Sequence, residues 1–347
     1  MSEPASGPHS PVNLLDDRQI ESARQTVQKI QDGLRQVLFG IDEIARFTLI
    51  GLLAGGHVLL EGLPGLGKTQ LVRSLSQLVG LQFRRLQFTP DLLPSDITGS
   101  HILSGDSQSR RFEFHPGPIF GNLILADEIN RASPKTQSAL LEAMQEHCAT
   151  VLGEPHPLPQ PFFVLATQNP IELEGTYPLP EAQLDRFALK ILLPPASEAA
   201  MTRIILERKG RPDPILPPVA DRNQIIQLVE TTREVAIATA VAEYIAAIVA
   251  RTSPESNPGS LLRYGAGPRA ALSLAQNARA HALLEGRPHV GFDDVQAVVH
   301  ATLRHRIGLS HTARLDGATT DQALDKIIES IPVQGRDLPK SLAESKT

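Results

Sequence analysis

Residues 62–69 read Gly-Leu-Pro-Gly-Leu-Gly-Lys-Thr and fit the phosphate-binding pattern G-x-x-x-x-G-K-[ST]. The glycines allow several backbone N–H groups to point at one phosphate. Lys68 would bind the outer phosphates of a nucleotide, and the hydroxyl of Thr69 would bind Mg²⁺. An apolar run at 58–60 precedes the loop, and apolar residues with helical spacing follow it at 71–79. The stretch therefore predicts a strand, a glycine loop and a helix whose N-terminus favours an anion.

Two adjacent carboxylates follow another apolar run. Residues 123–126 are apolar and lead directly into Asp127 and Glu128. Ligands of open α/β sheets bind at the carboxyl ends of the strands. At such an edge Asp127 could hold Mg²⁺, and Glu128 could act as general base toward the water that attacks the γ-phosphate. An acidic pair at a strand end is common by itself, but the phosphate loop upstream favours the catalytic interpretation.

Three more polar residues could take part in the same chemistry. Asn169 follows an apolar run at 162–166 and could orient the attacking water, or it could simply form an Asn-Pro turn. Arg186 could reach the nucleotide of a neighbouring subunit, or it could pair with Asp185 on the surface. Arg269 begins a helix and could contact phosphate or face solvent. The spacing of the motifs does not by itself assign a role to either arginine.

The chemistry needs a sheet to position it, and the apolar pattern predicts one. Strand-length apolar runs recur at 58–60, 83–88, 123–126, 162–166 and 187–193, with helical segments between most of them. This alternation is typical of a mostly parallel sheet with helices on both faces. From residue 198 onward the patterns are only helical. We therefore predict a disordered tail at 1–16, an α/β nucleotide-binding domain at 17–195, an all-helical domain at 196–331 and a C-terminal tail at 332–347.

Two segments interrupt the alternation of strands and helices. Residues 89–99 look like an irregular insertion after the second strand. Residues 150–161 contain four prolines and a central Gly153, which predicts a hairpin with a constrained turn.

Composition excludes several classes of protein. The 347 residues carry a net charge of −5 without a dense basic block, so the sequence does not indicate strong nonspecific binding to DNA. The single cysteine, Cys148, cannot form an internal disulfide and fits a reducing compartment. No run of 18 apolar residues and no signal-peptide pattern is present. We expect a cytoplasmic protein without membrane insertion.

The order of these motifs resembles that of the AAA+ ATPases, and the residues within the motifs resemble those of the MoxR family more closely still. The matching stretches are 62–69, Leu-Ala-Asp-Glu-Ile-Asn-Arg-Ala at 125–132, Gln-Ser-Ala-Leu-Leu-Glu-Ala-Met-Gln-Glu at 137–146, Ala-Thr-Gln-Asn-Pro at 166–170 and Glu-Gly-Thr-Tyr-Pro-Leu-Pro-Glu-Ala-Gln-Leu-Asp-Arg-Phe at 174–187. The resemblance covers about residues 20–330. It implies a P-loop fold with a parallel five-stranded sheet between helices, followed by a small all-α lid domain. The lid motif departs slightly, with Gly267 where the family usually has serine.

The resemblance also implies individual roles. The implied catalytic residues are Glu128, Asn169 as sensor 1, Arg186 as an arginine finger acting on the adjacent subunit, and Arg269 as sensor 2. The implied ATP-binding residues are Phe39, Gly40, Gly62, Leu63, Pro64, Gly65, Leu66, Gly67, Lys68, Thr69 and Gln70. The implied ligands of Mg²⁺ are Thr69 and Asp127. Arg131 also matches a family position, without a defined role.

The family resemblance implies an ATP-hydrolysing ring, expected to be a hexamer, that remodels or activates protein clients. Such activation includes metal or cofactor insertion and complex maturation, and a von Willebrand A-domain protein is the expected partner. The segments at 89–99 and 150–161 are expected near a central pore. Two alternatives stay open: a DNA-acting AAA+ motor and the motor subunit of a metal chelatase. A GTPase is disfavoured because the chain lacks an Asn-Lys-x-Asp motif.

Overall fold

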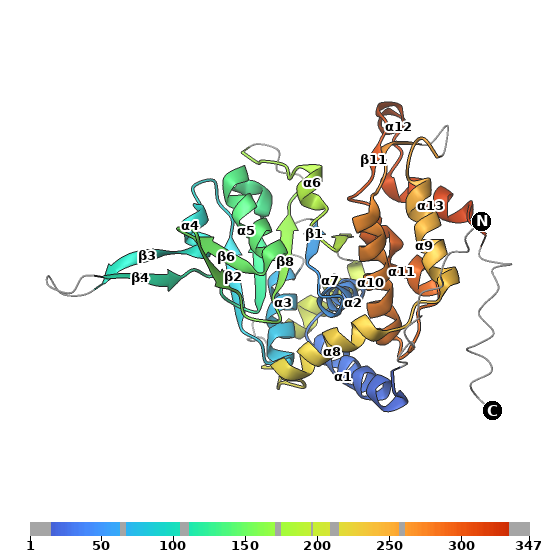
Figure 1. Cartoon of the computed structure of the whole chain (residues 1–347). Coiled ribbons are helices and arrows are strands. Elements are labelled where there is room, and N and C mark those ends of the chain that lie inside the picture. The colour runs from blue at the N-terminus through green and yellow to red at the C-terminus, as the bar shows by residue number, and fades with distance from the viewer. Residues whose placement is uncertain are drawn as a thin grey trace, which may run out of the picture.

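The computed structural model describes residues 15–62, 67–104, 111–170, 175–195, 197–208, 215–256 and 261–332. Its centre is a five-stranded sheet in the order β2-β5-β8-β1-β9, and every neighbouring pair is parallel (Figure 1). The strands are β1 (Val58–Glu61), β2 (Phe83–Gln87), β5 (Leu123–Asp127), β8 (Phe163–Gln168) and β9 (Leu189–Leu192). The predicted parallel sheet of five strands is confirmed.

Alternate residues of the three central strands, β1, β5 and β8, enter two separate hydrophobic clusters, one on each face of the sheet. In β5, Leu123 and Leu125 belong to one cluster, and Ile124 and Ala126 belong to the other. Burial on both faces explains why these strands read as continuous apolar runs. The first cluster includes residues of α1 (Asp17–Arg35), α2 (Asp42–Leu53) and α3 (Lys68–Leu78), and the second includes residues of α4 (Pro94–Thr98) and α5 (Pro134–Glu146).

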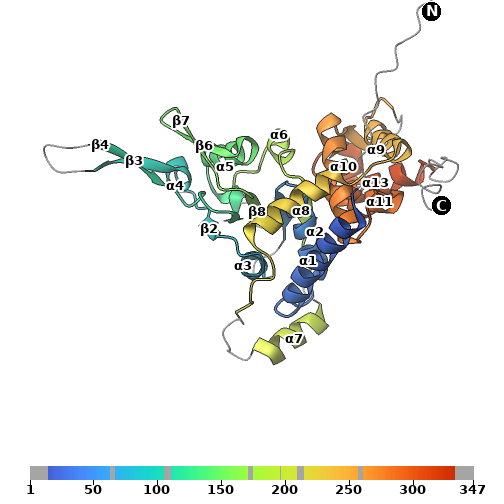
Figure 2. The same cartoon turned by 60° about the horizontal axis from the view of Figure 1, so that its bottom comes forward.

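The insertion after β2 is larger than predicted. The sequence indicated an irregular segment at 89–99, but the structure has α4 followed by a hairpin of β3 (Gly99–Ser104) and β4 (Arg111–Pro116). This hairpin projects away from the body of the molecule (Figures 1 and 2). Most of its residues are exposed, so it lacks the buried face whose two-residue period would have revealed strands.

The second interrupting segment folds as predicted. β6 (Cys148–Val151) and β7 (Glu154–Pro157) form an antiparallel hairpin. Its two turn residues, Leu152 and Gly153, have positive φ angles of 51° and 85°. Positive φ at both central positions is the geometry of the type I′ turn, which matches the twist of a tight hairpin.

The C-terminal part of the chain is mainly helical. Its helices are α7 (Glu198–Arg208), α8 (Arg222–Glu234), α9 (Thr239–Arg251), α10 (Pro268–Leu284), α11 (Phe292–Leu303), α12 (His311–Leu315) and α13 (Thr320–Glu329). A short antiparallel pair, β10 (Leu262–Tyr264) and β11 (Gly308–Leu309), accompanies them. These strands are too short to carry a period, so the sequence did not reveal them. No helix in the described part of the chain is long and apolar enough to cross a membrane.

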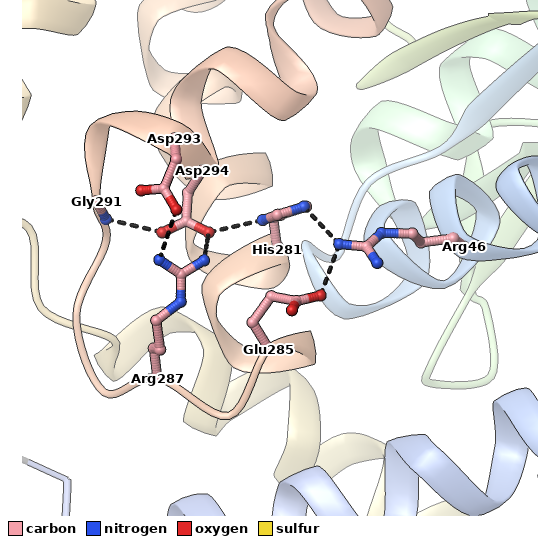
Figure 3. Close-up of polar contacts among 7 residues, drawn as sticks. All are labelled: Arg46, His281, Glu285, Arg287, Gly291, Asp293 and Asp294. Carbon is pink, nitrogen blue, oxygen red and sulfur yellow. Dashed lines mark hydrogen bonds and ion pairs between the residues drawn. The ribbon is translucent and has the colours of Figure 1, made fainter.

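A polar network joins α2 to the helices of the lid (Figure 3). Arg46 of α2 donates from Nη2 to Nε2 of His281 and to Oε1 of Glu285, both at 2.7 Å. A guanidinium cannot accept a hydrogen bond, so the proton of His281 lies on Nδ1. Nδ1 donates to Oδ1 of Asp294 at 2.6 Å, and Arg287 pairs with the same buried carboxylate at 2.5 Å. The network therefore couples the position of α2 to α10 and α11.

A buried histidine stands at the start of β1. Nε2 of His57 donates to the carbonyl oxygen of Met144 at 3.0 Å, and its Nδ1 accepts from the amide of Val164 at 3.1 Å. Both ring nitrogens are thus satisfied in the neutral form. Burial lowers the pKa of His57 from 6.5 to about 4. Burial likewise holds the pKa of His305 well below its usual value.

Because the pKa of His57 is lowered by burial, we expect the protein to lose stability in mild acid. Between pH 6.5 and pH 4 the unfolded state binds more protons than the folded state, so stability falls as the pH falls. His57 alone should lower the free energy of unfolding by about 2 kcal/mol from pH 7.5 to pH 5.0. Urea unfolding followed by circular dichroism at both values tests this. The pH dependence should weaken in His57→Gln and persist in a control, His115→Gln, whose ring is exposed. An unchanged dependence in His57→Gln would contradict the assignment.

Candidate functional site

The register of the sheet brings the candidate residues to one edge. Glu61 pairs with Gln168, and the pairing of Ala126 with Ala166 places the end of β5 beside the end of β8. The amide of Gly62 donates to the carbonyl oxygen of Gln168 at 3.2 Å, which fixes the entry to the phosphate loop next to β8. The carboxyl ends of β1, β5 and β8 are therefore neighbours.

Both described ends of the phosphate loop require glycine. A Cβ at Gly62 would lie 2.6 Å from Cβ of Leu193, and Gly67 has a φ of +79°. Lys68, Thr69 and Gln70 follow in the first turn of α3. Four predicted ATP-binding residues lie outside the described residues: Leu63, Pro64, Gly65 and Leu66.

Lys68 links the loop to the acidic pair. Its Nζ donates to the carbonyl oxygen of Gly62 at 3.0 Å. Partial burial lowers the pKa of Lys68, while the nearby carboxylates of Asp127 and Glu128 act in the opposite direction. The ammonium and both carboxylates therefore share one electrostatic site at the N-terminus of α3, where the helix dipole adds positive potential.

A threonine that the sequence did not single out organises the acidic pair. The hydroxyl of Thr167 donates to Oδ1 of Asp127 at 2.7 Å and accepts from the amide of Glu128 at 2.9 Å. Glu128 has a left-handed backbone, with φ 58° and ψ 49°. Such a conformation costs about 1–3 kcal/mol in a residue other than glycine and persists only where its surroundings enforce it. The two hydrogen bonds of Thr167 help to hold this backbone conformation. They also fix the positions of the two carboxylates relative to the end of β5.

Arginines neutralise both carboxylates. Arg85 of β2 pairs with Oδ2 of Asp127 at 2.7 Å, and Arg131 pairs with Oε2 of Glu128 at 3.1 Å. Gln87 donates to the same oxygen of Glu128 at 3.0 Å. Sequence reasoning missed Arg85 because its nearness to Asp127 depends on β2 lying beside β5. Arg131 now has a defined contact.

The donor set at this edge suits Mg²⁺. The carboxylate of Asp127 and the hydroxyl of Thr69 are hard oxygen donors, which Mg²⁺ prefers. The side chain of Asp127 is 16% exposed and already faces one cation, Arg85. These two residues would hold the metal, which would supply charge neutralisation to the phosphates of a bound nucleotide.

Phe39 and Gly40, which the family resemblance implies as ATP-binding residues, belong to a segment that lies beside the phosphate loop. A Cβ at Gly67 would lie 3.8 Å from Cδ1 of Ile41. The guanidinium of Arg203 lies over the ring of Phe39, 4.3 Å from its centroid. A Cβ at Gly40 would lie 2.6 Å from Cβ of Ala200. Helix α7 therefore packs directly on this segment.

Arg186 and Arg269 lie together, although 82 residues separate them in the chain. Both line a cavity of about 350 Å³, which Asp185 and Arg306 also line. Asp185 accepts from Arg269 at 3.3 Å and pairs with Nε of Arg306 at 2.8 Å. None of the residues that the structure describes pairs with the guanidinium of Arg186, so the alternative Arg186–Asp185 ion pair is absent.

Arg306, which sequence reasoning missed, holds the segment that carries Arg186. It donates from Nη2 to the carbonyl oxygens of Phe187 at 2.8 Å and Asp185 at 3.2 Å. Burial lowers the pKa of Arg306 to about 10, and the charge of Asp185 opposes that shift. The lid therefore sets the position of Arg186 through a buried, hydrogen-bonded guanidinium.

Comparisons with known proteins agree with this geometry. Residues 57–189 match the ATPase family associated with various cellular activities (AAA), and residues 256–327 match the AAA lid domain. The chain is 43% identical over 314 residues to the uncharacterized protein YeaC of Bacillus subtilis, covering 90% of this chain and 96% of that protein. It is 38% identical over 328 residues to the chaperone MoxR1 of Mycobacterium tuberculosis, covering 90% and 86% of the two chains. A crystal structure from Cytophaga hutchinsonii, provisionally assigned as an ATPase, superposes with a TM-score of 0.85 at 38% identity, covering 91% and 97% of the two chains.

Proposed function

Because the chain belongs to the MoxR family of AAA+ ATPases, we propose that it hydrolyses ATP with Mg²⁺ and uses the energy to remodel or activate a protein client. The observation that carries this proposal is that the carboxyl ends of β1, β5 and β8 are neighbours, which brings the phosphate loop with Lys68 and the pair Asp127 and Glu128 to one edge of the sheet. A cation, a metal-binding carboxylate and a general base are the groups that hydrolysis of a phosphoanhydride requires. The similarity to a protein named as a chaperone supports the protein client.

The proposed hydrolytic step divides the work among these residues. Lys68 would leave the carbonyl oxygen of Gly62 and bind the outer phosphates of ATP. Glu128 would accept a proton from the attacking water, and Asn169, directly after β8, would orient that water. Mg²⁺ held by Asp127 and Thr69 would neutralise charge on the phosphates. Arg131 pairs with Glu128, and this pairing would restrain the general base until the site is assembled.

We further propose that Arg186 and Arg269 act together on the nucleotide of a neighbouring subunit in a ring. They share one cavity, and Asp185 connects Arg269 to the segment that carries Arg186. An arginine supplied in trans makes hydrolysis depend on assembly. In this arrangement Arg269 would act between subunits, unlike a sensor 2 arginine that contacts the nucleotide of its own subunit.

The β3–β4 hairpin is proposed to contact the client. It projects from the body and exposes apolar side chains: Ile102 is 48% exposed, Leu103 49% and Phe112 73%. Leu103 and Phe112 are cross-strand partners, so they form one apolar surface element. Exposed apolar side chains that lie together are typical of protein contact sites.

Two further proposals rest on the sequence. The family resemblance supports a von Willebrand A-domain protein as a partner, and the single cysteine supports a cytoplasmic location.

Capture of clients tests the remodelling function. Glu128→Gln protein with ATP, expressed in its native cell, should retain a protein partner that is absent without nucleotide. Adding Phe112→Ser to it should reduce recovery at least tenfold, the effect of losing an interface hot spot. Leu315→Ser is the matched control because Leu315 of α12 is 74% exposed. Equal recovery from both variants would rule out the hairpin contact, and failure to recover any nucleotide-dependent partner would count against remodelling.

A further inference from the structure

Three potential metal ligands meet between the two hairpins. His101 lies on β3, and Glu154 and His156 lie on β7. One ligand atom from each residue lies within 4.8 Å of the other two. The β3–β4 and β6–β7 pairs are separate sheets, and about 50 residues lie between the two parts of the cluster. The cluster is outside the candidate nucleotide site and plays no part in the proposed hydrolysis.

Aromatic packing holds both imidazole rings in place. The ring of Phe114 stacks on His156 with centroids 3.8 Å apart and an interplanar angle of 13°. Phe114 is also the cross-strand partner of His101, and these two rings lie 5.6 Å apart. Phe120 packs edge-on against Phe114 at 5.5 Å. The histidines are thus ordered by their neighbours, which lowers the entropic cost of binding a ligand.

Polar atoms of the two histidines lack partners. Nδ1 of His101 and Nε2 of His156 are buried, and no described residue forms a hydrogen bond with either. A polar atom that is buried without a partner destabilises the folded protein. Such atoms in a folded protein call for an explanation, and a bound ion is one. Unpartnered nitrogens and a three-residue ligand cluster therefore point to the same place.

The chemistry of the donors selects the class of ion. Two imidazoles and one carboxylate suit Zn²⁺ and similar transition metals, whereas Mg²⁺ and Ca²⁺ prefer oxygen donors only. In a tetrahedral zinc site with bonds of about 2.0–2.1 Å, neighbouring ligand atoms lie about 3.4 Å apart. The three ligand atoms already lie within 4.8 Å of one another, and Glu154 is exposed, so its carboxylate has room to approach the two imidazoles.

We propose that His101, Glu154 and His156 form a site for a divalent transition metal of the Zn²⁺ type, which fastens the β3–β4 hairpin to the β6–β7 hairpin. The metal would leave one coordination position for water. Because the β3–β4 hairpin projects from the body, a metal at this point would restrict its movement relative to the sheet.

Metal titration of the full chain, prepared without a histidine tag, tests the site. Wild-type protein should bind about one Zn²⁺ tightly, and Co²⁺ should give the visible absorption of a tetrahedral complex. Glu154→Ala and His156→Phe should each weaken Zn²⁺ binding about 100-fold, since loss of a residue that only supports a metal ligand already costs about 10–100-fold, and these two are the ligands themselves. His156→Phe keeps a ring to stack on Phe114, so loss of binding would not reflect loss of folding. His115→Ala, which removes an exposed histidine from the same hairpin, should bind as wild type does.

Hydrogen exchange tests the mechanical role. Zn²⁺ should slow amide exchange in both β3–β4 and β6–β7 in wild-type protein and have no effect in His156→Phe. Absence of tight Zn²⁺ binding by wild type, or equal binding by the variants, would overturn the site. Tight binding without slower exchange in the hairpins would overturn the fastening role. Weak binding that persists in every variant would indicate ordinary surface histidines only.

Discussion

Glu128→Gln is expected to reduce the turnover number for ATP about 10³-fold while leaving ATP affinity within a few-fold of wild type. Glutamine keeps the size and one hydrogen-bond acceptor but cannot take a proton from the attacking water. It can still accept from Gln87 and Arg131, which contact Oε2 of Glu128 at 3.0 and 3.1 Å, so the fold should persist.

Phosphate release under saturating ATP and equilibrium binding of a fluorescent ATP analogue measure the two quantities separately. Glu142→Gln is a suitable control because Glu142 is an exposed glutamate of α5. Equal loss of binding and turnover in Glu128→Gln would indicate a structural role for Glu128. Turnover close to wild type would show that another group acts as the base.

Arg186→Ala is expected to lower turnover about 10³-fold or more, in the range known for arginine fingers, with ATP affinity unchanged. The described residues offer its guanidinium no ion pair, so its removal should cost the fold little. Arg203→Ala is the comparison variant, since Arg203 lies over Phe39 and its loss should alter ATP affinity instead. Steady-state kinetics of ATP hydrolysis separates the two patterns.

Mixed rings test whether Arg186 acts between subunits. Arg186→Ala and Glu128→Gln proteins are each expected to be nearly inactive alone. In an equal mixture about a quarter of the interfaces would combine an intact Glu128 with an intact Arg186 from the neighbour, and activity should return in proportion. Both variants must be found in the same rings, for example by native mass spectrometry. No recovery in such rings would show that Arg186 does not act in trans.

The local features of the candidate site could be predicted from the sequence because each depends on neighbouring residues. The phosphate loop needs glycines and Lys68 at fixed spacing, and the apolar run of β5 delivers Asp127 and Glu128 at its end. Burial on both faces made the central strands β1, β5 and β8 visible as apolar runs. The β3–β4 hairpin escaped detection beyond residue 99 because its side chains are mostly exposed and show no buried period.

Contacts between distant segments could not be predicted in this way. Arg85 reaches Asp127 only because β2 lies beside β5, and Arg306 holds Asp185 and Phe187 only because the end of α11 packs against the start of β9. The same holds for His101 and His156, which come from two separate hairpins.

Hydrophobic period and motif spacing act over short stretches of chain, so the buried strands, most of the helices and the nucleotide chemistry could be predicted from the amino-acid sequence. Which side chains meet depends instead on the tertiary structure. Arg269 joins Arg186 and Asp185, Thr167 bridges Asp127 and Glu128, and two histidines with one glutamate close a candidate metal site. Strand order and helix packing place these groups side by side, and they follow from burial of the whole chain rather than from any one segment.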